Sequence, residues 1–235
     1  MNARTSLYQQ YHRKHRHPSI PGSSNDAQGR PRHFQTESTS CLRAYIRAKA
    51  QQGDYAGAIT LLTELIDRNP TSAVDYNNRG LIYFQSGQLA NAIADYNKAL
   101  KLNPQLDSAY NNRANYYAAQ GLLSEAIGDY EIALDLNPRN IRAWINLGIT
   151  FRELGQYSRA LDNFEFALHL GQLASHIYAE RGRTYHLLGD WNCAISDYRR
   201  FLELEPPSDA ASRLRLQVQN WMNDLLNPLS HKSAS

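Results

Sequence analysis

Residues 73–106 read AVDYNNRGLIYFQSGQLANAIADYNKALKLNPQL, and this stretch decides the fold. Its central glycine belongs to a series that recurs every 34 residues: Gly53, Gly87, Gly121, Gly155 and Gly189. Alanines keep the same step: Ala58, Ala92, Ala126, Ala160 and Ala194. A fixed step of this length is typical of stacked helical hairpins, whereas a single irregular core gives no reason for it.

Both halves of residues 73–106 carry the apolar spacing of a helix. In the first half, Tyr76, Gly80 and Tyr83 recur at spacings of three and four, so they share one face. The second half runs from Leu89 to Leu102. Glycine between the halves supplies the left-handed conformation that ends a helix, and the proline after Asn103 ends the second helix. We therefore expect a helix–turn–helix unit.

The pattern resembles the tetratricopeptide repeat (TPR), a helix–turn–helix unit of 34 residues. The fourth unit shows the family motif best: Trp144, Leu147, Gly148, Phe151, Gly155, Tyr157, Ala160, Phe164 and Ala167. The resemblance covers residues 39–208, which align as 39–72, 73–106, 107–140, 141–174 and 175–208. It implies an all-α fold, a right-handed α-solenoid of five TPR repeats plus a C-terminal capping helix.

The two ends of the chain differ from the repeats. Leu214, Val218 and Trp221 recur at helical spacing, so residues 209–227 are expected to form the amphipathic capping helix, and 228–235 a loose C-terminus. Residues 1–38 mix polar residues with proline and glycine and show no helical or strand period. We expect them to be a disordered, basic, histidine-rich tail.

The tail carries most of the net positive charge. Residues 1–37 hold six Lys/Arg against two carboxylates, a net charge of +4, whereas residues 38–235 carry a net charge of −1. The run from His12 to His17 (HRKHRH) leaves four interpretations open. It could give residues 1–37 a weak contact with polyanions, hold a metal loosely, belong to a transit peptide, or simply be solvated.

Several function classes find no support in the sequence. It contains no Gly-rich phosphate loop, nucleophile elbow or cysteine pair, so we expect no enzyme activity, no cofactor and no metal site. No apolar run approaches the roughly 18 residues of a membrane span. The two cysteines, Cys41 and Cys193, fall in different units, so we expect free thiols and a cytoplasmic location.

The resemblance implies a concave groove that is lined by the first helix of each repeat and takes an extended peptide. Asparagines recur on these helices: Asn77, Asn78, Asn111, Asn112, Asn115 and Asn146. Asparagine is a mediocre helix former, and its amide offers the donor and the acceptor that a peptide backbone requires. The alternative is that these amides bond to their neighbours within the solenoid.

Basic residues accompany the asparagines: Arg43, Arg47, Arg142, Arg152 and Arg183. Because only Glu153 and Glu180 oppose them, we expect the groove to prefer an acidic peptide. The alternative is a solvated face without a selective ligand. A second arginine series, Arg79, Arg113 and Arg181, is expected to flank the groove or bridge neighbouring repeats.

Together these features predict a non-enzymatic protein–protein interaction scaffold, an adaptor or assembly factor whose partner is a protein segment. Some family members act as co-chaperones by clamping a chaperone's terminal carboxylate, but here only the asparagines match that clamp. The alternative function is association with nucleic acid or an anionic membrane through the tail, with the repeats docking a partner.

Overall fold

The computed structural model describes residues 39–205 and 213–226, which form eleven α-helices and no strand. In chain order the helices are α2 (Thr39–Gln51), α3 (Tyr55–Arg68), α4 (Ala73–Gln85), α5 (Leu89–Leu102), α6 (Asp107–Ala119), α7 (Leu123–Leu136), α8 (Ile141–Glu153), α9 (Tyr157–His169), α10 (Ala174–Leu188), α11 (Trp191–Leu204) and α12 (Arg213–Leu226). The predicted all-α class is confirmed. The predicted tail, residues 1–38, and residues 228–235 lie outside the described residues.

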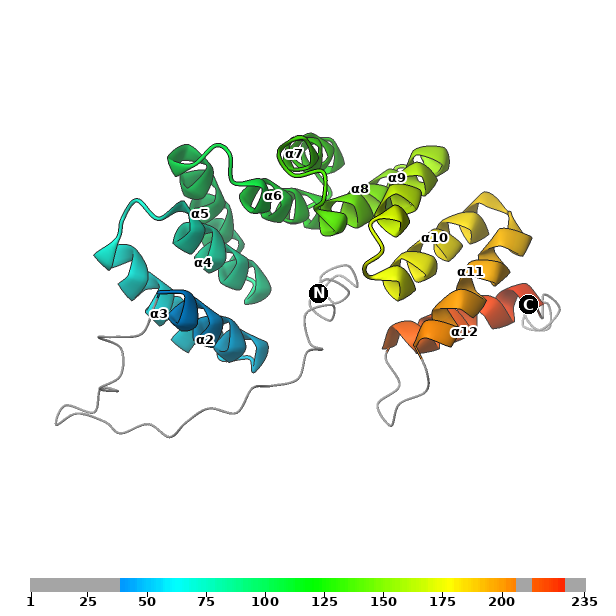
Figure 1. The fold of residues 1–235 in the computed structure, drawn as a ribbon, viewed down its shortest axis with the longest axis horizontal. Coiled ribbons are helices and arrows are strands. Elements are labelled where there is room, and N and C mark those ends of the chain that lie inside the picture. Colours follow the sequence, from blue (N-terminus) through cyan, green and yellow to red (C-terminus); the bar gives the residue numbers. More distant parts are fainter. Residues whose placement is uncertain (1–38, 206–212, 227–235) are drawn as a thin grey trace, which may run out of the picture. The chain divides into compact units, whose positions relative to one another are not determined.

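The chain divides into two compact units, residues 1–120 and 121–235. We call them the N-terminal unit, with α2 to α6, and the C-terminal unit, with α7 to α12. In the N-terminal unit, α4 packs against α3, α5 and α6 (Figure 1). In the C-terminal unit, α8 packs against α7 and α9, α10 packs against α9 and α11, and α12 follows against α11 (Figure 1).

Local sequence sets where the helices begin and end. Four helices begin after a side chain that accepts a hydrogen bond from the backbone N–H three residues later: Asp54, Ser72, Asn140 and Asp190. At the turns, Gly87 has a φ of +82° and Gly189 a φ of +86°. A Cβ at either glycine would meet no atom within 4 Å, so the backbone conformation, not space, requires glycine there.

A different requirement operates where the two helices of a hairpin cross. A Cβ on Gly80 would lie 2.8 Å from the ring of Tyr96, and one on Gly148 would lie 2.8 Å from the ring of Phe164. Both rings are completely buried. The second helix of each of these hairpins therefore places an aromatic ring against a glycine of the first, and a larger residue would force the helices apart.

Substitution of two glycines in the C-terminal unit separates these effects. Gly148→Ala should lower the free energy of unfolding by about 1–3 kcal/mol, because its methyl group overlaps Phe164. Gly128→Ala should instead raise it by about 0.5–1 kcal/mol, because Gly128 is exposed within α7 with open space around it. Urea denaturation followed by circular dichroism measures both. Equal effects of the two changes would contradict the packing argument.

Candidate functional site

The asparagines of the N-terminal unit form a chain of amides between α4 and α6. Asn112 Nδ2 donates to Asn77 Oδ1 at 3.0 Å, and Asn111 Nδ2 donates to Asn112 Oδ1 at 3.4 Å. Asn77 and Asn111 are buried, whereas Asn112 is half-buried. The predicted asparagines at positions 77, 111 and 112 therefore lie together, and part of their bonding capacity connects neighbouring repeats.

Two amide groups in this unit retain unused capacity. The Asn111 side chain is 8% exposed, and within the described residues its Oδ1 accepts no hydrogen bond. Asn78 is half-buried, and its amide makes no hydrogen bond to the described part of the chain. Asn115, one turn beyond Asn111, is buried. We call Asn77, Asn78, Asn111, Asn112 and Asn115 the asparagine stripe.

The arginines predicted on α2 differ in their surroundings. Arg43 donates to Asp75 through Nε at 2.6 Å and through a terminal nitrogen at 2.8 Å. This bidentate pair joins α2 to α4 and raises the pKa of Arg43 through the hydrogen bond to Asp75. The charge of Arg43 is therefore neutralised within the fold. Arg47 is exposed and makes no ion pair with any described residue.

In the C-terminal unit, α8 and α10 bring together charged residues around Arg152. Arg152 donates to Glu180 Oε2 at 2.7 Å and to the Glu180 backbone oxygen at 3.0 Å. Burial alone would raise the pKa of Glu180, but Arg152 and the neighbouring cations outweigh it and lower that pKa. Burial lowers the pKa of His176 in the same cluster. The predicted opposition of Glu180 to the basic residues is therefore a direct ion pair with Arg152.

The remaining predicted residues of this unit are Arg183, Arg142 and Asn146, and of these Arg183 also acts on Glu180. The guanidinium of Arg183 lies 4.9 Å from the ring centroid of Trp221 on α12. Tyr198, whose pKa is raised by burial, has its hydroxyl 3.4 Å from His186 Nδ1. Arg142 is exposed on α8 without an ion-pair partner among the described residues, and Asn146 is half-buried on the same helix.

The second arginine series forms a repeated structural contact that we call the arginine clasp. Arg79 on α4 binds both carboxylate oxygens of Asp95 on α5, at 2.7 and 2.9 Å, and donates to Thr63 of the preceding repeat at 3.1 Å. Its guanidinium lies 5.5 Å from the ring centroid of Tyr76 and 5.7 Å from that of Tyr83. The prediction that this series bridges neighbouring repeats holds for Arg79.

The clasp recurs in other repeats. Arg181 binds both oxygens of Asp197 at 2.8 Å, and its guanidinium lies near the rings of Tyr178 and Tyr185. Arg113 donates to Asn97 of the preceding repeat at 2.8 Å. Asp95 and Asp197 were not identified from the sequence as partners of the arginines, although both also fall on the 34-residue step.

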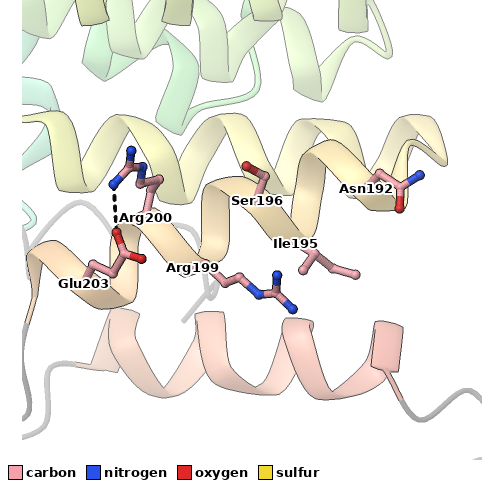
Figure 2. Close-up of a pocket in the computed structure, with 6 residues that line it drawn as sticks. All are labelled: Asn192, Ile195, Ser196, Arg199, Arg200 and Glu203. Atoms are coloured by element: carbon pink, nitrogen blue, oxygen red, sulfur yellow. Dashed lines mark hydrogen bonds and ion pairs between the residues drawn. The ribbon is translucent and has the colours of Figure 1, made fainter.

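Other features of the surface offer little chemistry. A hollow of about 360 Å³ lies on α11. Figure 2 shows its lining residues, among which the exposed Arg200 and Glu203 form an ion pair of 2.9 Å. All of its lining residues come from this one helix, so no groups converge on it from different elements. Within residues 39–205 and 213–226, no three His, Cys, Asp or Glu side chains are placed to hold a metal. None of the described helices is long and apolar enough to cross a membrane.

The helical hairpins and their small-residue contacts define a helical-repeat protein. Sequence profiles described as TPR or tetratricopeptide repeat match residues 43–72, 80–121, 108–140 and 130–162. The chain therefore belongs to the tetratricopeptide repeat family, as predicted. No curated protein matches it in sequence.

Solved structures share the fold at low sequence identity. A thermophilic TPR protein of Thermus thermophilus is 19% identical, with a TM-score of 0.67 over 79% of this chain and 99% of that one. PilF of Pseudomonas aeruginosa is 18% identical, with a TM-score of 0.65 over 83% of this chain and 92% of its own. YrrB, described as a TPR protein with an unusual peptide-binding site, is 24% identical, with a TM-score of 0.55 over 70% of this chain and 91% of its own. The family and fold support a scaffold for protein–protein interaction.

The clasp should contribute more to stability than an exposed ion pair. Asp95→Ala should lower the free energy of unfolding by about 3 kcal/mol, because it leaves the guanidinium of Arg79 largely buried without its carboxylate. Glu203→Ala should cost less than about 1 kcal/mol, because Arg200 and Glu203 are both more than half exposed. Chemical denaturation measures both. Similar losses in the free energy of unfolding would show that the clasp stabilises the fold no more than an exposed ion pair does.

Stability should also depend on the protonation of His176. Its folded pKa lies below the ordinary value of 6.5, so the unfolded chain binds a proton more readily. The free energy of unfolding should therefore fall as pH drops below 6.5 toward the folded pKa. His176→Gln should make this slope shallower, because it removes the group whose folded pKa is lowered. Equal slopes for wild type and His176→Gln would contradict this assignment.

Proposed function

We propose that the protein is a non-enzymatic scaffold whose asparagine stripe binds the main chain of an extended peptide from a partner protein. The observation that carries this proposal is the unused hydrogen-bonding capacity of two amides in the N-terminal unit. Asn111 Oδ1 is a buried acceptor without a partner among the described residues, and the Asn78 amide has both donors and its acceptor available there. Buried or half-buried polar groups of this kind gain most when a ligand satisfies them.

The amide chain between α4 and α6 supports the same interpretation. Because Asn112 donates to Asn77 at 3.0 Å, the orientations of these two amides are fixed before a ligand arrives. A preorganised site loses less conformational entropy on binding than a flexible one. An extended peptide presents alternating N–H and C=O groups, which match the two kinds of polar atom that an amide offers.

The predicted arginines bear on whether the peptide is acidic. Arg43 and Arg152 are each neutralised by a carboxylate of the chain, and Arg183 is among the cations that lower the pKa of Glu180, whereas Arg47 and Arg142 form no ion pair with a described residue. The exposed Arg47 of the N-terminal unit and the exposed Arg142 of the C-terminal unit each favour an acidic segment. The roles of assembly factor or co-chaperone and the cytoplasmic location stay predictions.

Peptide selection on the full chain tests the proposal. Selection from a random peptide display library should enrich sequences that bind wild type, and Asn78→Ala/Asn112→Ala should weaken their binding at least tenfold. The loss arises because Asn78→Ala removes an available donor and acceptor, and Asn112→Ala breaks the amide chain that orients Asn77 and Asn111. Isothermal titration calorimetry measures the affinities, and circular dichroism checks that the helices are intact.

Asn91→Ala/Asn192→Ala is the matched control, because it removes two exposed asparagines from second helices α5 and α11. This control should bind the selected peptides as wild type does. If the stripe variant also binds them as wild type does, the stripe is not the site. The selected peptides would then bind elsewhere on the chain, and the proposed binding site would be wrong.

A further inference from the structure

The fourth repeat lacks the arginine clasp that the second and fifth repeats contain. The arginine position reads Arg79, Arg113, Leu147 and Arg181 at steps of 34 residues. The carboxylate position reads Asp95, Asp129, Asn163 and Asp197 at the same step. Both members of the pair are therefore replaced together in one repeat, by an apolar residue and by a neutral amide.

The surroundings of the missing guanidinium are retained. Trp144 and Phe151 occupy the positions at which Tyr76 and Tyr83 flank Arg79. Leu147 is too short and apolar to take the place of an arginine, and a hollow of about 280 Å³ remains there, lined by residues of α7, α8 and α9. We call this hollow the repeat-four slot. Its lining includes Trp144, which stacks on Phe166 with ring centroids 5.1 Å apart, and Phe151, which is 2% exposed.

A polar atom without a partner lines the slot. Asn163 is 8% exposed, and its Nδ2 donates to the backbone oxygen of Arg159 at 2.7 Å. Within the described residues its Oδ1 accepts no hydrogen bond. In the second repeat, the same position supplies the carboxylate that accepts from Arg79. Asn163 therefore lines the slot and carries a buried acceptor at the position whose side chain accepts from arginine in the second repeat.

The lining of the slot carries a net negative charge. Asp135 on α7 and Asp162 on α9 line it and make no ion pair within the described part of the chain. Glu131 is 3.8 Å from Arg159, whose guanidinium lies 3.8 Å from the ring centroid of Phe151. The Arg159 side chain is 56% exposed and reaches one wall of the slot, but it leaves Asn163 Oδ1 unsatisfied. Three carboxylates against one cation favour a positively charged ligand.

We propose that the repeat-four slot binds the arginine side chain of a basic peptide segment. The guanidinium of the peptide would displace that of Arg159 from the ring of Phe151, lie between Trp144 and Phe151, donate to Asn163 Oδ1, and be drawn in by Asp135 and Asp162. Each of these interactions is one that a guanidinium makes well: stacking on aromatic faces and donating several hydrogen bonds in one plane. In the fourth repeat, an arginine of the peptide would supply the guanidinium that Arg79 supplies in the second repeat and Arg181 in the fifth.

The slot is separate from the residues that we propose bind an extended peptide. On α8, Trp144, Leu147 and Phe151 share one side of the helix, whereas Arg142 and Asn146 lie about half a turn away. A variant of the slot therefore leaves the asparagine stripe unchanged. Failure of this proposal is distinguishable from failure of the proposed function.

The test measures binding of a labelled peptide to the full chain by fluorescence anisotropy. The probe is residues 8–21 of this chain, YQQYHRKHRHPSIP, which contains Arg13 and Arg16. The host carries Arg13→Gln, Lys14→Gln and Arg16→Gln, so that its own basic run does not compete. The matched control peptide has citrulline at both arginine positions, which removes the charge and keeps the shape. We expect the citrulline peptide to bind at least tenfold more weakly.

Two variants of the host test the slot itself. Asn163→Asp should tighten binding about tenfold, because it restores the carboxylate of the other repeats. Leu147→Arg/Asn163→Asp should abolish binding and raise the melting temperature, because it rebuilds the clasp inside the slot. Asp162→Asn should weaken binding several-fold, whereas Glu165→Gln, an equal loss of charge on α9 outside the slot, should not.

The outcomes decide both the site and the source of its ligand. No binding of the probe, equal binding of the citrulline peptide, or unchanged binding to Leu147→Arg/Asn163→Asp would overturn the proposal. If the probe binds the modified host more tightly than the unmodified chain, the chain's own basic run occupies the slot. If the two hosts bind it equally, the arginine comes from another protein, and the site assignment stands.

Discussion

The close contact between a glycine and an aromatic ring fixes the distance between the two helices of a hairpin. Gly80 meets Tyr96 and Gly148 meets Phe164, in each case at 2.8 Å from the position of an added Cβ. Because the rings are fully buried, they cannot move aside without opening the core of the unit. The other contacts within a repeat, including the arginine clasp, depend on this spacing, since the clasp joins residues of the same two helices.

The arginine clasp and the repeat-four slot are two uses of one position in the repeat. Where arginine and aspartate occupy it, a guanidinium lies beside two aromatic rings and joins the helices. Where leucine and asparagine occupy it, the rings remain, and the buried acceptor at position 163 has no donor among the described residues. The loss of the clasp leaves a hollow of about 280 Å³ beside Leu147, because a rigid frame does not collapse fully onto a missing side chain.

The sequence predicts the helices well because each repeat supplies the same local signals. The glycine step places the turns, and the structure begins α5 at Leu89 and ends it at Leu102, the two residues expected. The environments of the charged residues were less predictable. Arg43 bonds to Asp75, which lies 32 residues away and so matches neither the helical spacing nor the repeat step. The replacement at Leu147 and Asn163 can be read from the sequence, but its meaning depends on whether neighbouring side chains fill the space.

A crystal structure of the full chain grown with N-methylguanidine tests the central claim most directly. The account predicts a planar ligand between Trp144 and Phe151, with one nitrogen in hydrogen-bond distance of Asn163 Oδ1 and the helices of the repeat unmoved. It predicts no ligand beside Asp95 or Asp197, because arginines of the chain already occupy those sites. A structure in which the guanidinium of Arg159 bonds to Asn163 Oδ1 and excludes the ligand would contradict the account.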